Sequence, residues 1–210
     1  MLEGKGILQR RQGLGTFVAT TTPESALFHF FRLRQADGAQ VQPHLLSENI
    51  RKRAVRASER SALRDCGDRV YELVRVRAVD GTPVVRETIV FPVSLFPGLH
   101  ERGELPNALY ALFQRSYGIA VVGAKEKLKA AAAGEEDSAA LHVEQGFPLL
   151  QVDRSAIDIT DRVVELRSRR LVPYYPLYYI SLGLRCPCGG PPLLHQLVVP
   201  WLLWSWPEWP

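Results

Sequence analysis

Few cysteines occur in this sequence, and no apolar segment is long enough to cross a bilayer. The 210 residues include three cysteines, Cys66, Cys186 and Cys188, whose spacing fits neither a disulfide framework nor a tetrahedral zinc site. We therefore expect free thiols in a reducing cytoplasm. The longest apolar stretch, residues 193–206, is shorter than the roughly 20 residues of a transmembrane helix and contains Pro200. No membrane partner is expected.

Metal sites, catalytic triads and secretion signals also lack the residues that they need. Neither Ser155 nor Ser181 has a nearby His–Asp arrangement, and Met1–Lys5 leads into polar residues rather than the apolar segment of a signal peptide. The histidines are scattered, so a metal site would require several of them to converge by folding. The sequence therefore predicts no catalytic residue, no metal and no cofactor. The five histidines are His29, His44, His100, His142 and His195.

The N-terminal segment GILQRRQGLGTFVA predicts a β-hairpin with two arginines before its tip. Gly13 and Gly15 adopt the positive φ angles of tight turns at low cost, and Thr16 begins a β-prone run. Arg10 and Arg11 are suited to contacting phosphates. An ordinary hairpin with a solvated arginine pair is the alternative. The net charge of +4 permits a polyanionic partner without requiring one.

Extended segments outnumber helices in the body of the chain and mostly follow one another as hairpins. One hairpin, RVYELVRVRAVDGTPVVRETIVFP, turns at Asp80-Gly81. We therefore expect an α+β fold, an antiparallel sheet with helices on one face. The segment AKEKLKAAAAGEED is interpreted as a charged, alanine-rich surface segment. Short helices are predicted at residues 58–67, 106–118 and 135–143.

The hairpin that turns at Asp80-Gly81 carries the residues best suited to binding a ligand. Arg75 and Arg77 are two residues apart, so they point to the same face of a strand. A two-residue loop places Glu87 on the opposite face, whereas a three-residue loop at residues 79–81 with a glycine bulge places it with the arginines. We choose the second arrangement, because it leaves a mostly apolar opposite face. Arginine forks bind phosphate or carboxylate in a bidentate manner. The alternative is a solvated arginine pair.

Five motifs follow one another in the body: FFRLRQADG, LRDCGDRVYELVRVRAVDGTPVVRETIVFPVSLFPGL, LYALFQRSYGIAV, PLLQVDRSAID and VVELRSRRL…YYPLYYISLG. In this order they are similar to the UTRA ligand-sensing domain of the HutC/FarR subfamily of GntR-type transcriptional regulators. The resemblance implies a chorismate-lyase-like fold, an antiparallel sheet flanked by helices, in a homodimer. It also implies that a small effector changes the affinity of attached winged helices for an operator.

The resemblance also implies an effector pocket. An R-x-R motif followed ten residues later by glutamate lines the pocket in the family and falls on Arg75, Arg77 and Glu87. A late V-E-x-R motif adds Glu165 and Arg167. An aromatic residue of the last strand often covers the ligand; the candidates are Tyr174, Tyr175, Tyr178 and Tyr179, of which Tyr178 is carried forward.

The expected effector is a small anion that also bears hydrogen-bond donors. Sugar-phosphate sensors of the family tend to have serines after the Y-G-I motif, whereas this sequence has Gly123, Ala124 and Lys125. An amino acid derivative, an aromatic acid or a sugar acid is therefore favoured over a sugar phosphate. The alternative functions are a chorismate-lyase-like enzyme acting on a small carboxylic acid, and an interaction module that docks through a Trp-rich tail.

The segment EGKGILQRRQGLGTFVA resembles the end of the GntR winged helix, so we interpret it as a wing without the helices that normally read DNA. If Met1 is the true start, Arg10 and Arg11 would contact phosphates without reading bases, and DNA binding would be weak or lost. We predict a cytoplasmic, homodimeric repressor. Its expected divisions are a wing at residues 1–19, a linker at 20–25, the sensing domain at 26–183 and a disordered Pro/Trp-rich tail at 184–210.

Overall fold

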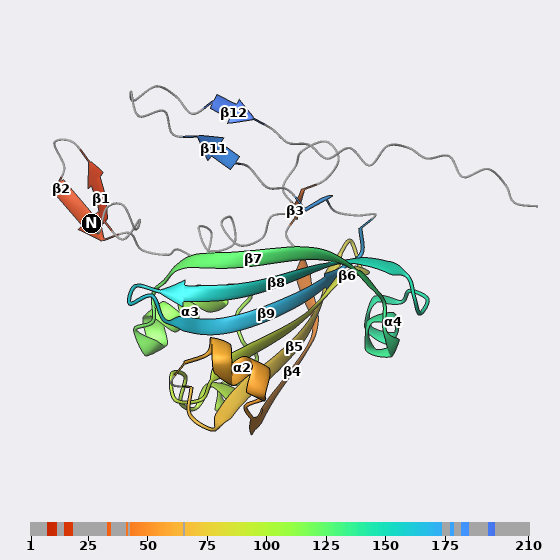
Figure 1. The fold of residues 1–210 in the computed structure, drawn as a ribbon, viewed down its shortest axis with the longest axis horizontal. Helices are drawn as coiled ribbons and strands as arrows, with labels where there is room; N and C mark the ends of the chain where they lie inside the picture. The colour runs from red at the N-terminus through yellow and green to blue at the C-terminus, as the bar shows by residue number, and fades with distance from the viewer. Residues whose placement is uncertain are drawn as a thin grey trace, which may run out of the picture.

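A six-stranded antiparallel sheet forms the body of the protein in the computed structural model (Figure 1). The structure describes residues 8–11, 15–18, 33–34, 41, 43–64, 66–173, 177–178, 182–184 and 193–195, with side chains for 41, 43–64 and 66–173. In spatial order the strands are β4 (His44–Ala54), β5 (Arg69–Val79), β6 (Thr82–Pro92), β9 (Val163–Leu171), β8 (Pro148–Asp158) and β7 (Val121–Ala132). The helices are α2 (Ala57–Ala62), η1 (Leu99–Glu101), α3 (Leu109–Tyr117) and α4 (Glu135–Leu141).

The predicted α+β class and antiparallel sheet are confirmed, but the prediction of helices on one face is wrong. Side chains alternate between the two faces of a strand, so Leu73 and Val70 of β5 lie on different faces. Phe113 of α3 belongs to the same buried cluster as Leu73, and we call this the inner face. Leu63, directly after α2, packs with Val70 and Val90 on the outer face. Both faces therefore bury apolar side chains.

Three short two-stranded sheets lie outside this body. β1 (Leu8–Arg11) pairs with β2 (Gly15–Val18), so the predicted N-terminal hairpin is present. Gly13 lies outside the described residues, as do the side chains of Arg10, Arg11 and Thr16 and most of the predicted tail. The other pairs are β3 (Leu33–Arg34) with β10 (Leu177–Tyr178), and β11 (Leu182–Leu184) with β12 (Leu193–His195). No helix in the described ranges is long and apolar enough to cross a membrane.

The turn between β5 and β6 differs from the predicted turn, although it places Glu87 on the predicted face. The loop has two residues, Asp80 and Gly81, with φ angles of 49° and 80°, the positive values that a type I′ turn requires. Glu87 nevertheless lies opposite Arg75, because the register shifts farther along the strands and leaves Val84 as an extra residue in β6. The extra residue that reverses the parity is therefore in the strand and not in the turn.

The two edge strands include segments that the sequence does not predict as strands. β7 contains most of the alanine-rich segment that was interpreted only as surface, and β4 continues through ENIRKRA. Lysine, alanine and glutamate have low β propensity, which explains why the pattern did not reveal these strands. Both segments are largely exposed, as expected for edges that pair on one side only.

An aromatic cluster anchors α3 to one half of the inner face. The ring centroids of Phe96 and Phe113 are 4.3 Å apart, and those of Phe91 and Phe113 are 5.8 Å apart. All three rings are fully buried. Gly118, at φ 66°, ends α3 as the sequence predicts. The cluster holds the helix across the sheet, so that Tyr110, one turn before Phe113, reaches the charged half of the same face.

Replacing Phe113 with alanine should lower the free energy of unfolding by about 3–5 kcal/mol, because it removes a buried ring that the surrounding side chains cannot replace. Ser116 is exposed on the same helix, and Ser116→Ala should change the free energy by less than about 0.5 kcal/mol. Urea unfolding followed by circular dichroism measures both values. Equal values for the two variants would show that the aromatic cluster does not anchor α3.

Candidate functional site

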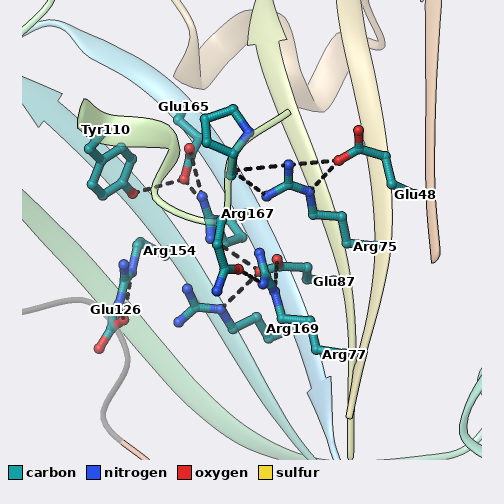
Figure 2. Close-up of polar contacts among 12 residues, drawn as sticks. Glu48, Arg75, Arg77, Glu87, Tyr110, Glu126, Arg154, Glu165, Arg167 and Arg169 are labelled. Atoms are coloured by element: carbon teal, nitrogen blue, oxygen red, sulfur yellow. Dashed lines mark hydrogen bonds and ion pairs between the residues drawn. The ribbon is translucent and has the colours of Figure 1, made fainter. Parts of the chain in front are cut away.

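Every strand of the six-stranded sheet contributes a charged side chain to one band across the inner face (Figure 2). We call this band the inner charge row. Its side chains are between 0% and 11% exposed, so they are removed from water almost completely. The row consists of Glu48 of β4, Arg75 and Arg77 of β5, Glu87 of β6, Glu165, Arg167 and Arg169 of β9, Arg154 of β8 and Glu126 of β7.

Glu87 lies at the centre of the row and accepts hydrogen bonds from three arginines. Its Oε1 is 2.6 Å from Arg77 Nε, and its Oε2 is 3.1 Å from Arg167 Nη1 and 3.3 Å from Arg169 Nε. Burial alone would raise the pKa of Glu87, but the three guanidiniums outweigh burial and hold that pKa well below its usual value. Glu87 is therefore a carboxylate that joins β5, β6 and β9.

Glu165 forms a second junction with Arg167 and Tyr110. Arg167 donates to both carboxylate oxygens at 2.9 Å, a two-bond fork, and the Tyr110 hydroxyl donates to Oε1 at 2.9 Å. Burial, together with the charge of Glu165, raises the pKa of Tyr110 to about 12. Burial would lower the pKa of Arg167, but Glu165 and Glu87 outweigh it and raise that pKa. Tyr110 therefore stays a donor and Arg167 stays charged.

Arg75 is held by one carboxylate and by the backbone of the loop before α3. Its Nε is 2.7 Å from Glu48 Oε2, and its Nη2 is 2.9 Å from the carbonyl oxygen of Leu105. Both Nη atoms also lie 3.3 Å from the carbonyl oxygen of Pro106. Burial and the neighbouring guanidinium of Arg77 lower the pKa of Arg75, although Glu48 opposes the shift. The carboxylates near Arg75 therefore do not fully offset its burial and the charge of Arg77.

The other end of the row lies on the opposite edge of the sheet. Arg154 Nε donates to Glu126 Oε1 at 2.7 Å, and Arg154 Nη2 also pairs with this carboxylate. Buried charges are tolerated in proteins when they are paired and hydrogen-bonded. Among the described side chains, the row contains five guanidiniums and four carboxylates.

The structure brings together five of the residues that the sequence selects: Arg75, Arg77, Glu87, Glu165 and Arg167. Tyr178 lies in β10, and its side chain is outside the described residues. The sequence does not predict four members of the row or two residues that contact it. The members are Glu48, Glu126, Arg154 and Arg169, and the contacting residues are Asn107 and Tyr110.

Arg169 could have been predicted from its spacing. It lies two residues after Arg167, which lies two residues after Glu165, so all three side chains point to the same face of β9. Asn107 and Tyr110 carry no such signal, since they reach the row from the loop and helix that cross it. Within the described ranges, no group of three or more His, Cys, Asp or Glu side chains is arranged to hold a metal ion.

Comparisons with known structures identify the fold. The model of the UTRA domain family matches residues 46–173. The ligand-binding domain of a GntR-family transcriptional regulator from Bordetella bronchiseptica is 31% identical, with a TM-score of 0.63, and the match covers 73% of this chain and 97% of that one. The effector domain of PhnF from Mycobacterium smegmatis is 26% identical, with a TM-score of 0.56, over 63% of this chain and 81% of that one.

Full-length relatives have the same assignment. An Escherichia coli (strain K12) protein named "Probable fructoselysine utilization operon transcriptional repressor" is 28% identical over 170 residues, 79% of this chain and 68% of the relative. The transcriptional repressor NagR of Bacillus subtilis (strain 168) is 26% identical over 159 residues, 73% of this chain and 64% of the relative. These relatives are regulators and not enzymes, as the sequence predicts. The chain belongs to the UTRA family and contains the effector-binding domain of a GntR-family transcriptional regulator of the HutC subfamily.

Proposed function

We propose that the inner charge row binds a small anionic metabolite and that this binding changes the affinity of a transcriptional repressor for its operator. The observation that carries the proposal is the burial of two neighbouring guanidiniums, Arg75 and Arg77, on one face of β5, where burial and the charge of Arg77 lower the pKa of Arg75. A charge in such a place is costly unless it is paired, so a bound carboxylate or phosphate gains more there than on the surface.

The two arginines of β5 supply the anion-binding part of the proposed site. Arg75 and Arg77 point to one face and carry planar forks that match two oxygens of a carboxylate or phosphate. Glu87 and Glu165 are acceptors, so they suit hydroxyl or amine donors on the same molecule. This combination supports an amino acid derivative, an aromatic acid or a sugar acid, ahead of a sugar phosphate. Arg167 and Tyr178 complete the proposed set.

The relatives support the regulatory half of the proposal. Several are named as repressors, and their names refer to different systems, which is why we transfer the role and not a particular effector. The effector would act by favouring one of two conformations of a cytoplasmic homodimer that differ in DNA affinity. The proposed sensing domain extends over residues 26–183, and the pairing of β3 with β10 supports that extent on both sides of residues 46–173.

The proposed wing lies in the β1–β2 hairpin. Arg10 and Arg11 lie on β1, and Gly15 and Thr16 open β2 directly opposite them. This register is compatible with a basic wing that contacts phosphates. The proposed wing residues also include Gly13, which lies between the two strands in the sequence.

Changing either β5 arginine to lysine should weaken binding of an anionic effector about ten- to a hundredfold, or about 1.4–2.8 kcal/mol. Lysine keeps the charge of Arg75 or Arg77 but loses the fork. Alanine is less suitable, because it would leave the buried Glu48 or Glu87 with fewer positive partners and destabilise the fold. A thermal-shift screen of a metabolite library finds the ligand, and calorimetry on Arg75→Lys and Arg77→Lys measures the loss.

Arg86→Lys is the matched control for these variants. Arg86 belongs to the same hairpin but pairs with Glu136 and Asp137 of α4 on the outer face, so its change should leave binding unaltered. Hits that are all neutral or cationic would contradict the proposal. Equal affinity in the parent, Arg75→Lys and Arg77→Lys would place the site elsewhere.

The full chain should form a dimer in solution. The family assignment motivates this expectation, and the exposed edge strand β7, on which Leu128 is 42% exposed, offers surface that a second copy would cover. Sedimentation velocity at concentrations from one to tens of micromolar measures the mass. A monomer throughout that range would overturn the dimeric part of the proposal and leave the effector site untouched.

A further inference from the structure

The loop between η1 and α3 lies on the same two arginines that the proposed effector requires. Leu105 and Pro106 present their carbonyl oxygens to Arg75, and Asn107 presents its side-chain oxygen to Arg77 Nη1. The three oxygens come from consecutive residues and all are neutral. They take hydrogen bonds that the oxygens of a carboxylate or phosphate would take from the same guanidiniums.

Outside this subsite the loop also contacts Glu48, the Tyr117 ring through Arg102, and the aromatic cluster. The Leu105 amide donates to Glu48 Oε1 at 2.9 Å, and the Leu105 side chain is buried in the aromatic cluster. Pro106 is exposed, and so are the residues from Glu101 to Glu104. Gly103, at φ 75°, has a conformation that glycine adopts at low cost. The loop is therefore held over the row by polar contacts with Arg75, Arg77 and Glu48 and by the buried side chain of Leu105.

With the loop in place, Arg75 and Arg77 are both 0% exposed. An effector that reaches their guanidiniums from solvent must therefore replace groups that already lie there. Neutral acceptors are the weaker partners, because a carboxylate or phosphate adds the attraction between opposite charges, which is strong where water is excluded. An anion can make this exchange favourable. A neutral ligand would interact with the two guanidiniums no more strongly than the loop oxygens do.

We propose that the segment Leu105–Asn107 is the resident occupant of the anion subsite, and that an anionic effector binds by displacing its three oxygens from Arg75 and Arg77. This inference rests on the proposed function for the choice of an anion. It goes beyond that function by naming the groups that the anion replaces. It also gives Asn107 a role, which is to set the affinity of the subsite for the effector and to select charged over neutral ligands.

The main variant is Asn107→Asp, which makes one of the three loop oxygens part of a carboxylate. The charged loop competes better for Arg77, so the dissociation constant of an anionic probe should rise at least tenfold. Asn107→Ala removes an acceptor and should lower the dissociation constant twofold or more. The two changes act in opposite directions, which a general loss of folding does not produce. The probes are the anionic hits of the thermal-shift screen, together with glucuronate, benzoate and inorganic phosphate.

Asn49→Asp is the matched control. Asn49 is exposed on β4 opposite Val74, so the substitution adds the same charge on the outer face. It should leave the dissociation constants unchanged. A second readout is hydrogen exchange at the Leu105 amide, which the probe should accelerate at least fivefold if the loop leaves Glu48 and Arg75.

The outcomes separate the two proposals. A probe whose affinity falls in Arg77→Lys but is equal in the parent, Asn107→Asp and Asn107→Ala would overturn the loop inference and leave the proposed function standing. Unchanged exchange at Leu105 in the bound protein would also overturn it. If no anionic probe binds the parent, the proposed function fails and the loop inference fails with it.

Discussion

The shared carboxylate of Glu87 is the interaction on which the inner face depends. Three buried guanidiniums from two strands converge on it, and removing a charge from water costs several kcal/mol unless an opposite charge compensates. Its position follows from one backbone irregularity, the extra residue Val84 in β6. Without that bulge, strand parity would turn Glu87 away from the face that carries Arg75 and Arg77. A one-residue feature of the backbone thus sets the electrostatics of the site.

This dependence also explains what the sequence could and could not predict. The common face of Arg75 and Arg77 follows from two-residue spacing, and the α+β class follows from the succession of hairpins. The face of Glu87 depends on where an extra residue lies, and TPVVRE carries no mark of a bulge at Val84. Asn107 and Tyr110 were not predicted because loop and helix meet the sheet only through tertiary packing. The pattern does not reveal the Lys- and Ala-rich part of the edge strand β7, because lysine and alanine have low β propensity.

One half of the inner face is an apolar core that stabilises the fold, and the other half carries charged side chains. Phe91, Phe96 and Phe113 pack as an apolar core, whereas the neighbouring positions on the same strands carry arginine and glutamate. An apolar replacement of a buried ion network is often neutral or stabilising, so stability alone does not favour the charged half. Its retention beside a well-packed core is consistent with a role in recognition, where paired charges give direction and selectivity.

α3 joins these two halves, and this determines where a change in the loop would be felt. Phe113 fixes the helix to the aromatic cluster, while Tyr110, one turn earlier, donates to Glu165 in the row. The loop enters α3 directly, with only Ala108 between Asn107 and the first helical residue. If an anion displaces the loop, the first turn of α3 receives the displacement, because the turn with Phe113 is held. The hydrogen bond from Tyr110 to Glu165 is then a second contact, beside the shared carboxylate of Glu87, through which occupancy of the β5 arginines reaches β9.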